Sequence, residues 1–304
     1  MPAAHPATRT DDTRHLACVR TPYKLGRPLL VPSYRAGAWD SHSVDTPFLF
    51  RHEGRFRMVH NAFDGIGYRS GLASSDDLLT WEREGMITDR DPADPRFAFN
   101  AHITSVLRHP DLFGSGEALR VDGDLIATWQ AYPDPGQEQG RGCIGIARAR
   151  DLRSWRMGAT VLRPEDGAAW ERGGLYKPCL VRHDGRFFLF YNAKEVLDWP
   201  WREQIGLAWS DDLVHWTRHP LNPVVPNGPE GSVDAVFTAD PCVLRLEDGT
   251  CAMFHYGLGS DHVARELVAF SDDLLTWRKG DEVLVDVGPT GSLDDQYAHK
   301  PGVI

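Results

Sequence analysis

Short runs of alternating apolar and polar residues, separated by turn residues, follow one another along the chain. Three stretches superpose by eye, each with a strand-like run, a turn and a second strand-like run: residues 45–63, 176–194 and 239–258. Their turns read HEGR, HDGR and EDGT. An acidic residue followed by Gly between β-rich runs is typical of a β-hairpin. Helical periodicity is weak throughout, so the pattern predicts antiparallel β structure.

A second repeat follows each hairpin. The motif Asp-Leu-x-x-Trp occurs four times, ending at Trp81, Trp155, Trp216 and Trp277. We expect its Asp to cap a tight turn between a third and a fourth strand by accepting hydrogen bonds from backbone N–H groups. We expect the Leu to fill the interior and the Trp to pack the outer strand against its neighbour. Four equivalent tryptophans cannot all face one site, so this motif is interpreted as structural.

Each unit thus holds four antiparallel strands, and the sequence predicts an all-β fold, a five-bladed β-propeller of four-stranded antiparallel blades. The unit around residues 102–131 is looser, and residues 299–304 restart the pattern, so the fifth blade is incomplete. Residues 15–23 and 26–33 are expected to supply its outer strands; otherwise its edges would be open. We expect residues 1–14 to be a disordered tail and residues 15–304 to be a single propeller domain.

The composition narrows the class of protein. The 304 residues are 41% hydrophobic and carry a formal net charge of −10, which argues against nucleic acid or an anionic membrane as a partner. Five scattered cysteines without a Cys-x-x-Cys pair argue against a disulfide framework or a structural zinc site. No apolar signal segment or 18-residue apolar run occurs, so we expect a cytoplasmic protein. No cofactor-binding motif or metal ligand set is evident, and the oligomeric state stays open.

The SxDLxxW turns and the Asp-Pro or Lys-Pro pairs that open the strands resemble the five-bladed β-propeller glycoside hydrolases. That superfamily includes glycoside hydrolase family 43, with families 32, 62, 117 and 130 as relatives, and the resemblance covers about residues 40–304. It implies that Asp45, which opens the first unit, is the general base or nucleophile. Family 43 has Glu-Gly-Pro where this chain reads Tyr176-Lys177-Pro178, so the resemblance supplies no general acid.

In a propeller the first strands line the central channel, so their starts should converge on one funnel. Glycoside cleavage needs one carboxylate as base or nucleophile and a second carboxyl group with a raised pKa as acid. The predicted catalytic residues are Asp45, Asp240 and Glu195. Other candidates for the acid are Glu171, Glu203, His102 and His299. The predicted substrate-binding residues are His102, Lys177, His299, Lys300, Asn192, Trp129 and Trp201.

Three functions stay open. The first is a glycosidase that cleaves a short oligosaccharide, with a furanoside as one candidate. The second is a glycoside phosphorylase, in which Lys177 and Lys300 would bind inorganic phosphate rather than neutralise the carboxylates, as in the resemblance to family 130. The third is a non-catalytic carbohydrate-binding propeller, which the missing Glu keeps open.

Overall fold

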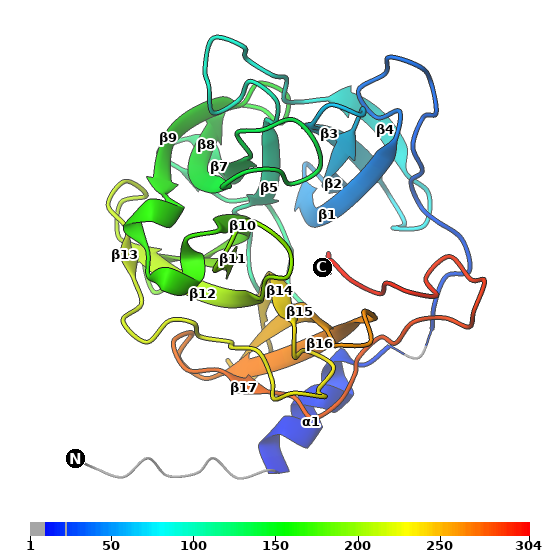
Figure 1. Cartoon of the computed structure of the whole chain (residues 1–304), viewed down its shortest axis with the longest axis vertical. Coiled ribbons are helices and arrows are strands. Elements are labelled where there is room, and N and C mark those ends of the chain that lie inside the picture. Colours follow the sequence, from blue (N-terminus) through cyan, green and yellow to red (C-terminus); the bar gives the residue numbers. More distant parts are fainter. Residues whose placement is uncertain (1–9, 22) are drawn as a thin grey trace.

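Three hydrogen-bonded sheets, built almost entirely from antiparallel strand pairs, account for most of the regular structure in the computed structural model, which describes residues 10–21 and 23–304 (Figure 1). The first sheet runs in the order β1 (Ser43–His52), β2 (Arg55–Phe63), β3 (Tyr68–Ser75) and β4 (Glu82–Met86). The second runs β5 (His102–Val106), β7 (Asp124–Ala131), β8 (Cys143–Ala149) and β9 (Arg156–Leu162), and the short β6 (Arg120–Val121) pairs with β7.

The third sheet consists of two four-stranded units. One contains β10 (Gly174–His183), β11 (Arg186–Lys194), β12 (Glu203–Ser210) and β13 (Thr217–Arg218). The other contains β14 (Phe237–Arg245), β15 (Cys251–Leu258), β16 (Ala264–Ser271) and β17 (Arg278–Lys279). A single parallel pair, Glu203 with Phe237, joins them. The 3-10 helices η1 (Pro164–Asp166) and η2 (Ala169–Glu171) precede β10. The predicted all-β fold with four-stranded repeats is confirmed.

The predicted fifth blade has no strand in the described residues. Between the fourth and first units lie residues 20–21, 23–42 and 280–304, which contain none of the strands, and the C-terminal end approaches the centre of the ring (Figure 1). There the Arg108 guanidinium donates to the carbonyl oxygen of Val303 at 2.6 Å. The sheet pairing therefore shows four blade-like units and does not establish a fifth.

The start of the described chain is a helix, α1 (Thr10–Val19). Two predictions are therefore wrong: residues 10–14 are not disordered, and residues 15–19 form no strand, while residues 1–9 lie outside the described part. Leu16 packs with Phe270 and Val268 of β16, and the His15 imidazole contacts the Asp248 carboxylate at 2.9 Å. These distant partners stabilise the helix, and a window of local sequence does not contain them. No helix in residues 10–21 and 23–304 is long and apolar enough to cross a membrane.

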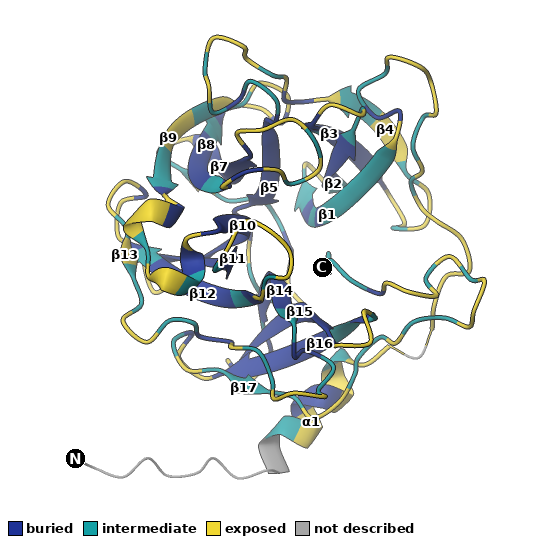
Figure 2. Cartoon of the chain, viewed as in Figure 1, coloured by how far each residue is buried: buried dark blue, intermediate teal, exposed yellow. Residues whose placement is uncertain are grey.

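Apolar side chains from adjacent units pack face to face. Phe48 and Phe50 of the first unit share one cluster with Ile103 and Trp129 of the second. Comparable clusters join the second unit to the third and the third to the fourth. Figure 2 shows buried residues concentrated in the strands and exposed residues in the connecting loops. The hydrophobic core is thus a series of layers between units, which leaves the axis of the ring to polar groups.

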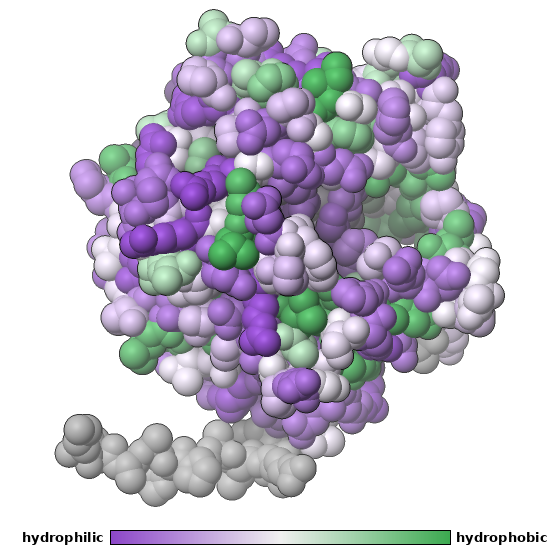
Figure 3. All heavy atoms as spheres, in the orientation of Figure 1, coloured by the Kyte–Doolittle hydropathy of each residue, from purple (hydrophilic) through white to green (hydrophobic). Residues whose placement is uncertain are grey.

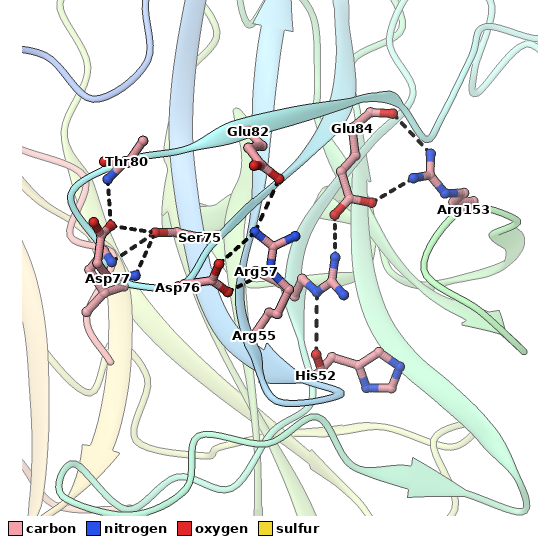
Figure 4. A network of polar contacts seen from close by, with 11 residues as sticks. His52, Arg55, Arg57, Ser75, Asp76, Asp77, Thr80, Glu82, Glu84 and Arg153 are labelled. Carbon is pink, nitrogen blue, oxygen red and sulfur yellow. Dashed lines mark hydrogen bonds and ion pairs between the residues drawn. The ribbon is translucent and has the colours of Figure 1, made fainter.

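The Asp-Leu-x-x-Trp turns have the structural role predicted for them. In the first turn, Oδ1 of Asp77 accepts hydrogen bonds from the N–H groups of Leu79 at 2.8 Å and Thr80 at 2.7 Å (Figure 4). The same pair of bonds recurs at Asp151, Asp212 and Asp273. In three of the turns the Trp indole N–H donates to the carbonyl of the motif Leu at 3.1 Å. Each turn is therefore closed by its own side chains.

One of these turns also links two units. Arg153, in the second turn, donates to the Glu84 carboxylate on β4 at 2.7 Å and to the Glu84 carbonyl oxygen at 3.0 Å (Figure 4). Arg57 of β2 binds the same carboxylate from within the first unit. The Arg153 side chain is exposed, and exposed ion pairs contribute little stability, so the contact between Arg153 and Glu84 mainly orients the outer edges of neighbouring units.

The turn contacts predict that replacing Asp273 destabilises the fold more than replacing its neighbour Asp272. Asp273→Ala should lower the free energy of unfolding by about 1 kcal/mol, because two backbone N–H groups lose their acceptor. Asp272→Ala is the matched control, since the Asp272 carboxylate is exposed and only pairs with Arg278 at 2.9 Å; its effect should be about 0.5 kcal/mol or less. Chemical denaturation of both variants measures this, and equal losses would contradict the capping role.

Candidate functional site

Each first strand carries a bulge where it reaches the centre of the ring. Pairing is interrupted between Asp45 and Phe48 in β1, Tyr176 and Cys179 in β10, and Ala239 and Cys242 in β14, and again in β5. In three of these bulges the second residue is Pro, which has no N–H for the ladder. The preceding residues adopt left-handed φ values: 48° at Thr46, 46° at Lys177, 58° at Asp240, and 64° at Lys300 in the C-terminal segment.

These bulges converge, as the sequence predicts. One small central cavity is lined by Thr104 and by Thr46, Lys177, Asp240 and Lys300, each of these four together with the Pro that follows it. Left-handed conformations are uncommon for residues other than Gly and mark positions that the surrounding structure constrains. The same backbone position in successive units therefore presents hydroxyl, ammonium and carboxylate groups to the axis.

Two lysines neutralise carboxylates near the axis. The Lys300 ammonium pairs with Oδ2 of Asp45, while Oδ1 of Asp45 accepts the N–H of Thr46 at 2.8 Å. The Lys177 ammonium lies 3.1 Å from both Oε1 of Glu138 and Oγ1 of Thr46. Burial alone would raise the pKa of Asp45 and Glu138, but the positive charges of Lys300 and Lys177 outweigh it and hold both below their usual ranges. Both groups are thus carboxylates at neutral pH.

Two other carboxyl groups, those of Asp240 and Glu203, have pKa values that are raised rather than lowered. Burial raises the pKa of Asp240 to about 7 despite the nearby Lys177 and Lys300. Its Oδ2 has no hydrogen-bond partner among the described residues. Burial, together with the charge of Glu138, also raises the pKa of Glu203. The Glu203 carboxyl accepts hydrogen bonds from Asn192 Nδ2 at 2.7 Å and Trp201 Nε1 at 2.9 Å.

Glu138 and Glu203 share a cavity of about 410 Å³. One wall is the loop after β7, which carries Glu138; another is the loop between β11 and β12, which carries Trp199 and Trp201. The two indole rings meet edge to face, with centroids 5.2 Å apart. Figure 3 shows that the middle of this face of the molecule is mostly hydrophilic, with a few isolated hydrophobic groups. The cavity thus combines two carboxyl groups with aromatic surface on which a sugar ring can stack.

Two predicted site residues lie elsewhere. Trp129 has no exposed surface and packs edge to face on Phe97, 4.8 Å between centroids, inside the core between the first two units. The Glu195 carboxylate accepts the N–H of Arg202 at 3.0 and 3.1 Å, so it closes the loop between β11 and β12 and does not line the cavity. Neither residue is brought to the funnel, because the chain places Trp129 on the opposite face of its strand and Glu195 beyond the end of its strand.

The remaining candidates for the acid are poorly suited to the role. Burial lowers the pKa of His102 well below its ordinary value, and burial with the charge of Lys300 lowers that of His299 to about 4. Both imidazoles are therefore neutral at pH 7. Glu171 is buried beneath the third unit, where it accepts a hydrogen bond from Tyr191 and pairs with Arg218 at 2.9 Å. His299 and Glu203 both line cavities, and of the two only Glu203 has a raised pKa.

Sequence reasoning missed Glu138. It lies in the segment PDPGQEQGR, which the pattern identifies only as a turn. A usable signal was present: this loop follows a second strand, as does the loop containing Trp201, and such loops reach the funnel. The partner of Glu138, Lys177, is 39 positions further along the chain and belongs to another unit.

Comparison with known proteins identifies the family. Residues 119–291, more than half of the chain, match the glycosyl hydrolases family 32 N-terminal domain. The chain belongs to this family. The predicted resemblance to the propeller glycoside hydrolases is thereby confirmed.

Similar proteins include both hydrolases and a phosphorylase. A 1,2-beta-oligomannan phosphorylase of Thermoanaerobacter sp. (strain X514) is 24% identical over 157 residues, 50% of this chain and 43% of that protein. The match to this chain thus spans less than half the length of that relative. A solved glycoside hydrolase shares its fold with a TM-score of 0.83 and 22% identity, covering 97% of this chain and 87% of that one. Another solved structure comes from work on the GH130 family of mannoside phosphorylases, which is described as containing glycoside hydrolases that target beta-1,2 mannosidic linkages. It has a TM-score of 0.65 and 16% sequence identity, and the match covers 90% of this chain and 82% of that one.

The raised pKa of Asp240 predicts a pH dependence of stability. Because its pKa is raised on folding, stability is full below the unfolded pKa near 4 and falls as pH rises toward 7. Asp240→Asn keeps the left-handed backbone accessible and should reduce this fall by more than about 1.4 kcal/mol, the equivalent of one pKa unit. Denaturation of wild type and variant at pH 4 and pH 8 measures it.

The matched control is Asp184→Asn, which changes an exposed carboxylate that also has a left-handed backbone, with φ 47°. It should leave the slope of stability against pH unchanged. An Asp240→Asn variant with the wild-type slope would show that Asp240 is not the group with the raised pKa.

Proposed function

We propose that this protein is a glycoside hydrolase that cleaves a short oligosaccharide, with Glu203 as the general acid and Glu138 as the general base or nucleophile. One observation carries the proposal: the two groups line one cavity, and their environments displace their pKa values in opposite directions. Such a pair identifies the acid and the base of a site. Membership of the glycosyl hydrolase family supports the same class of reaction.

Each group has contacts that suit its role. Glu203, held by Asn192 and Trp201, has a fixed orientation, and burial raises the pKa of its carboxyl group, so it is suited to protonate the departing glycosidic oxygen. Glu138 is kept ionised by Lys177, so it can activate water or attack the sugar. Trp199 and Trp201 offer apolar faces for a sugar ring.

Asp45 is the alternative base, as the family resemblance implies. Its carboxylate is ionised, and Lys177 contacts both Glu138 and the neighbouring Thr46, so the two carboxylates flank one lysine. Asp45 does not line the cavity that contains Glu203, which is why Glu138 is preferred.

A glycoside phosphorylase is the second candidate, because one relative carries that name. The contacts of the lysines proposed to bind phosphate weigh against it: Lys177 bonds to Glu138, and Lys300 to Asp45. Strict dependence of turnover on inorganic phosphate would favour the phosphorylase. A complete lack of turnover with retained sugar binding would favour a non-catalytic propeller.

Glu203→Gln should lower kcat by about 10²–10⁴-fold on oligosaccharides, because the amide cannot donate the proton. The loss should be smaller on aryl glycosides whose leaving group needs no protonation. Glu195→Gln is the matched control, since Glu195 lies in the adjoining loop and outside the cavity, and its activity should stay near wild type. The measurement is sugar release from furanosides, pyranosides and short oligosaccharides, with and without phosphate. Wild-type rates in Glu203→Gln would exclude Glu203 as the acid.

Glu138→Ala and Asp45→Ala distinguish the two candidate bases. We expect Glu138→Ala to lose turnover of activated aryl glycosides by orders of magnitude, and added azide to restore part of it, because a small anion can occupy the site of the missing carboxylate. Azide should not rescue Asp45→Ala. Rescue confined to Asp45→Ala would move the role of base or nucleophile to Asp45.

A further inference from the structure

Lys194 is a buried cation without an anionic partner. It ends β11, is 4% exposed and lines the cavity that holds Glu138 and Glu203. Within the described part of the chain, its ammonium makes no ion pair within 4.0 Å. Two other lysines of this region, the buried Lys177 and the half-buried Lys300, each bond to a carboxylate. Lys194 is thus the one cation of the cavity wall whose charge the described residues leave unpaired.

The nearest candidate partner is engaged elsewhere. Lys194 pairs in register with Glu203 on β12, so the two side chains project from the same face of the sheet. The oxygens of Glu203 instead accept hydrogen bonds from Asn192 and Trp201. The Lys194 ammonium lies over aromatic rings, 4.2 Å from the Trp201 centroid and 5.2 Å from that of Tyr176. Trp201 therefore holds the two side chains apart, one by its N–H and the other by its ring face.

The contacts of the Lys194 ammonium offset only part of the free energy lost when its charge is removed from water. A cation–π contact offsets some of the lost hydration, but a buried ammonium is fully stabilised only by an anion or several hydrogen-bond acceptors. Burial accordingly lowers the pKa of Lys194. An oxyanion entering the cavity would pair with the Lys194 ammonium and accept hydrogen bonds from it.

We propose that Lys194 binds the carboxylate of an acidic sugar, and that the substrate is an oligosaccharide carrying a uronic acid residue in the cavity beside Glu203. The identity of the bond cleaved rests on the function proposed above, whereas recognition of the carboxylate does not.

A sugar carboxylate fits better than free phosphate. The residues lining the cavity include a single cation, Lys194, and several acidic groups. A dianion would meet more repulsion there than a monoanion, since repulsion scales with charge. The charges of the nearby acids are reduced: Glu203 has a raised pKa, Glu138 is paired with Lys177, and Asp134 and Asp198 are exposed to solvent.

Binding of a substrate carboxylate to Lys194 would also favour the role of Glu203 as the general acid. The charge of Lys194 lowers the pKa of Glu203, opposing the effect of burial. A substrate carboxylate on Lys194 would cancel part of that charge and keep Glu203 protonated to higher pH. An acidic substrate would therefore improve the protonation state of the group that has to donate the proton.

The test compares two variants on matched ligands. The probes are aldouronic oligosaccharides and oligogalacturonides, each in native form and with its carboxyl groups reduced to alcohols, and binding is measured by calorimetry in the Glu203→Gln background. We expect at least one native probe to bind ten-fold or more tightly than its reduced form. Lys194→Met, which keeps the shape without the charge, should abolish the difference, and Lys194→Arg should retain most of it. Thermal unfolding of each variant checks that it is folded.

Several outcomes would overturn the proposal. Equal affinity for native and reduced forms would do so, as would discrimination that survives in Lys194→Met. Inorganic phosphate that binds wild type and not Lys194→Met, with no preference for acidic sugars, would assign Lys194 to phosphate instead.

Failure of the proposed catalytic role is distinguishable from these results. If Glu203→Gln hydrolyses at the wild-type rate while Lys194→Met still loses the preference for acidic sugars, the assignment of the acid is wrong and carboxylate recognition stands. If Glu203→Gln is inactive but no probe discriminates, the hydrolase stands and the acidic substrate is wrong.

Discussion

Neutralisation of charge at the axis of the ring is the interaction on which the site depends. Carboxylates and lysines from different units meet there, and each would be costly to bury alone. The contacts of Lys300 with Asp45 and of Lys177 with Glu138 and Thr46 cross between units, so they join segments that lie more than a hundred residues apart as well as closer ones. The same contacts hold the pKa values of Asp45 and Glu138 below their usual ranges, whereas burial raises the pKa values of Asp240 and Glu203.

The repeated turns and bulges of the units form the scaffold of the site, and the side chains that differ between the repeats form its chemical groups. The capped turns and the Pro-containing bulges recur from unit to unit with nearly the same hydrogen bonds. At one equivalent position the side chain changes from Thr46 to Lys177 to Asp240. A backbone that converges by repetition can thus present different groups to one axis, which is how a propeller hosts different functions.

The loops after the second strands complete the site. Trp201 donates its N–H to Glu203, presents its ring to Lys194 and lines the cavity, so one side chain positions an acid, separates it from a cation and offers a surface to a sugar. A similar fold is found in a protein named as a glycoside hydrolase, and a protein of related sequence is named as a phosphorylase. The difference between such activities therefore depends on side chains like these, and the shared strands do not decide it.

The sequence by itself determined the hairpins, the capped turns and the convergence of the strand starts, because each depends on residues a few positions apart or on the repetition of one pattern. Asp45, Lys177, Asp240 and Lys300 could be placed near one another for that reason. Only the tertiary structure decided that Trp129 packs in the core, that Glu195 closes a loop, and that Glu138 meets Lys177. It also decided that residues 10–19 are helical, through contacts with β16. The burial and the charge state of a side chain in the site depend on neighbours from several units, and a local sequence pattern does not contain those neighbours.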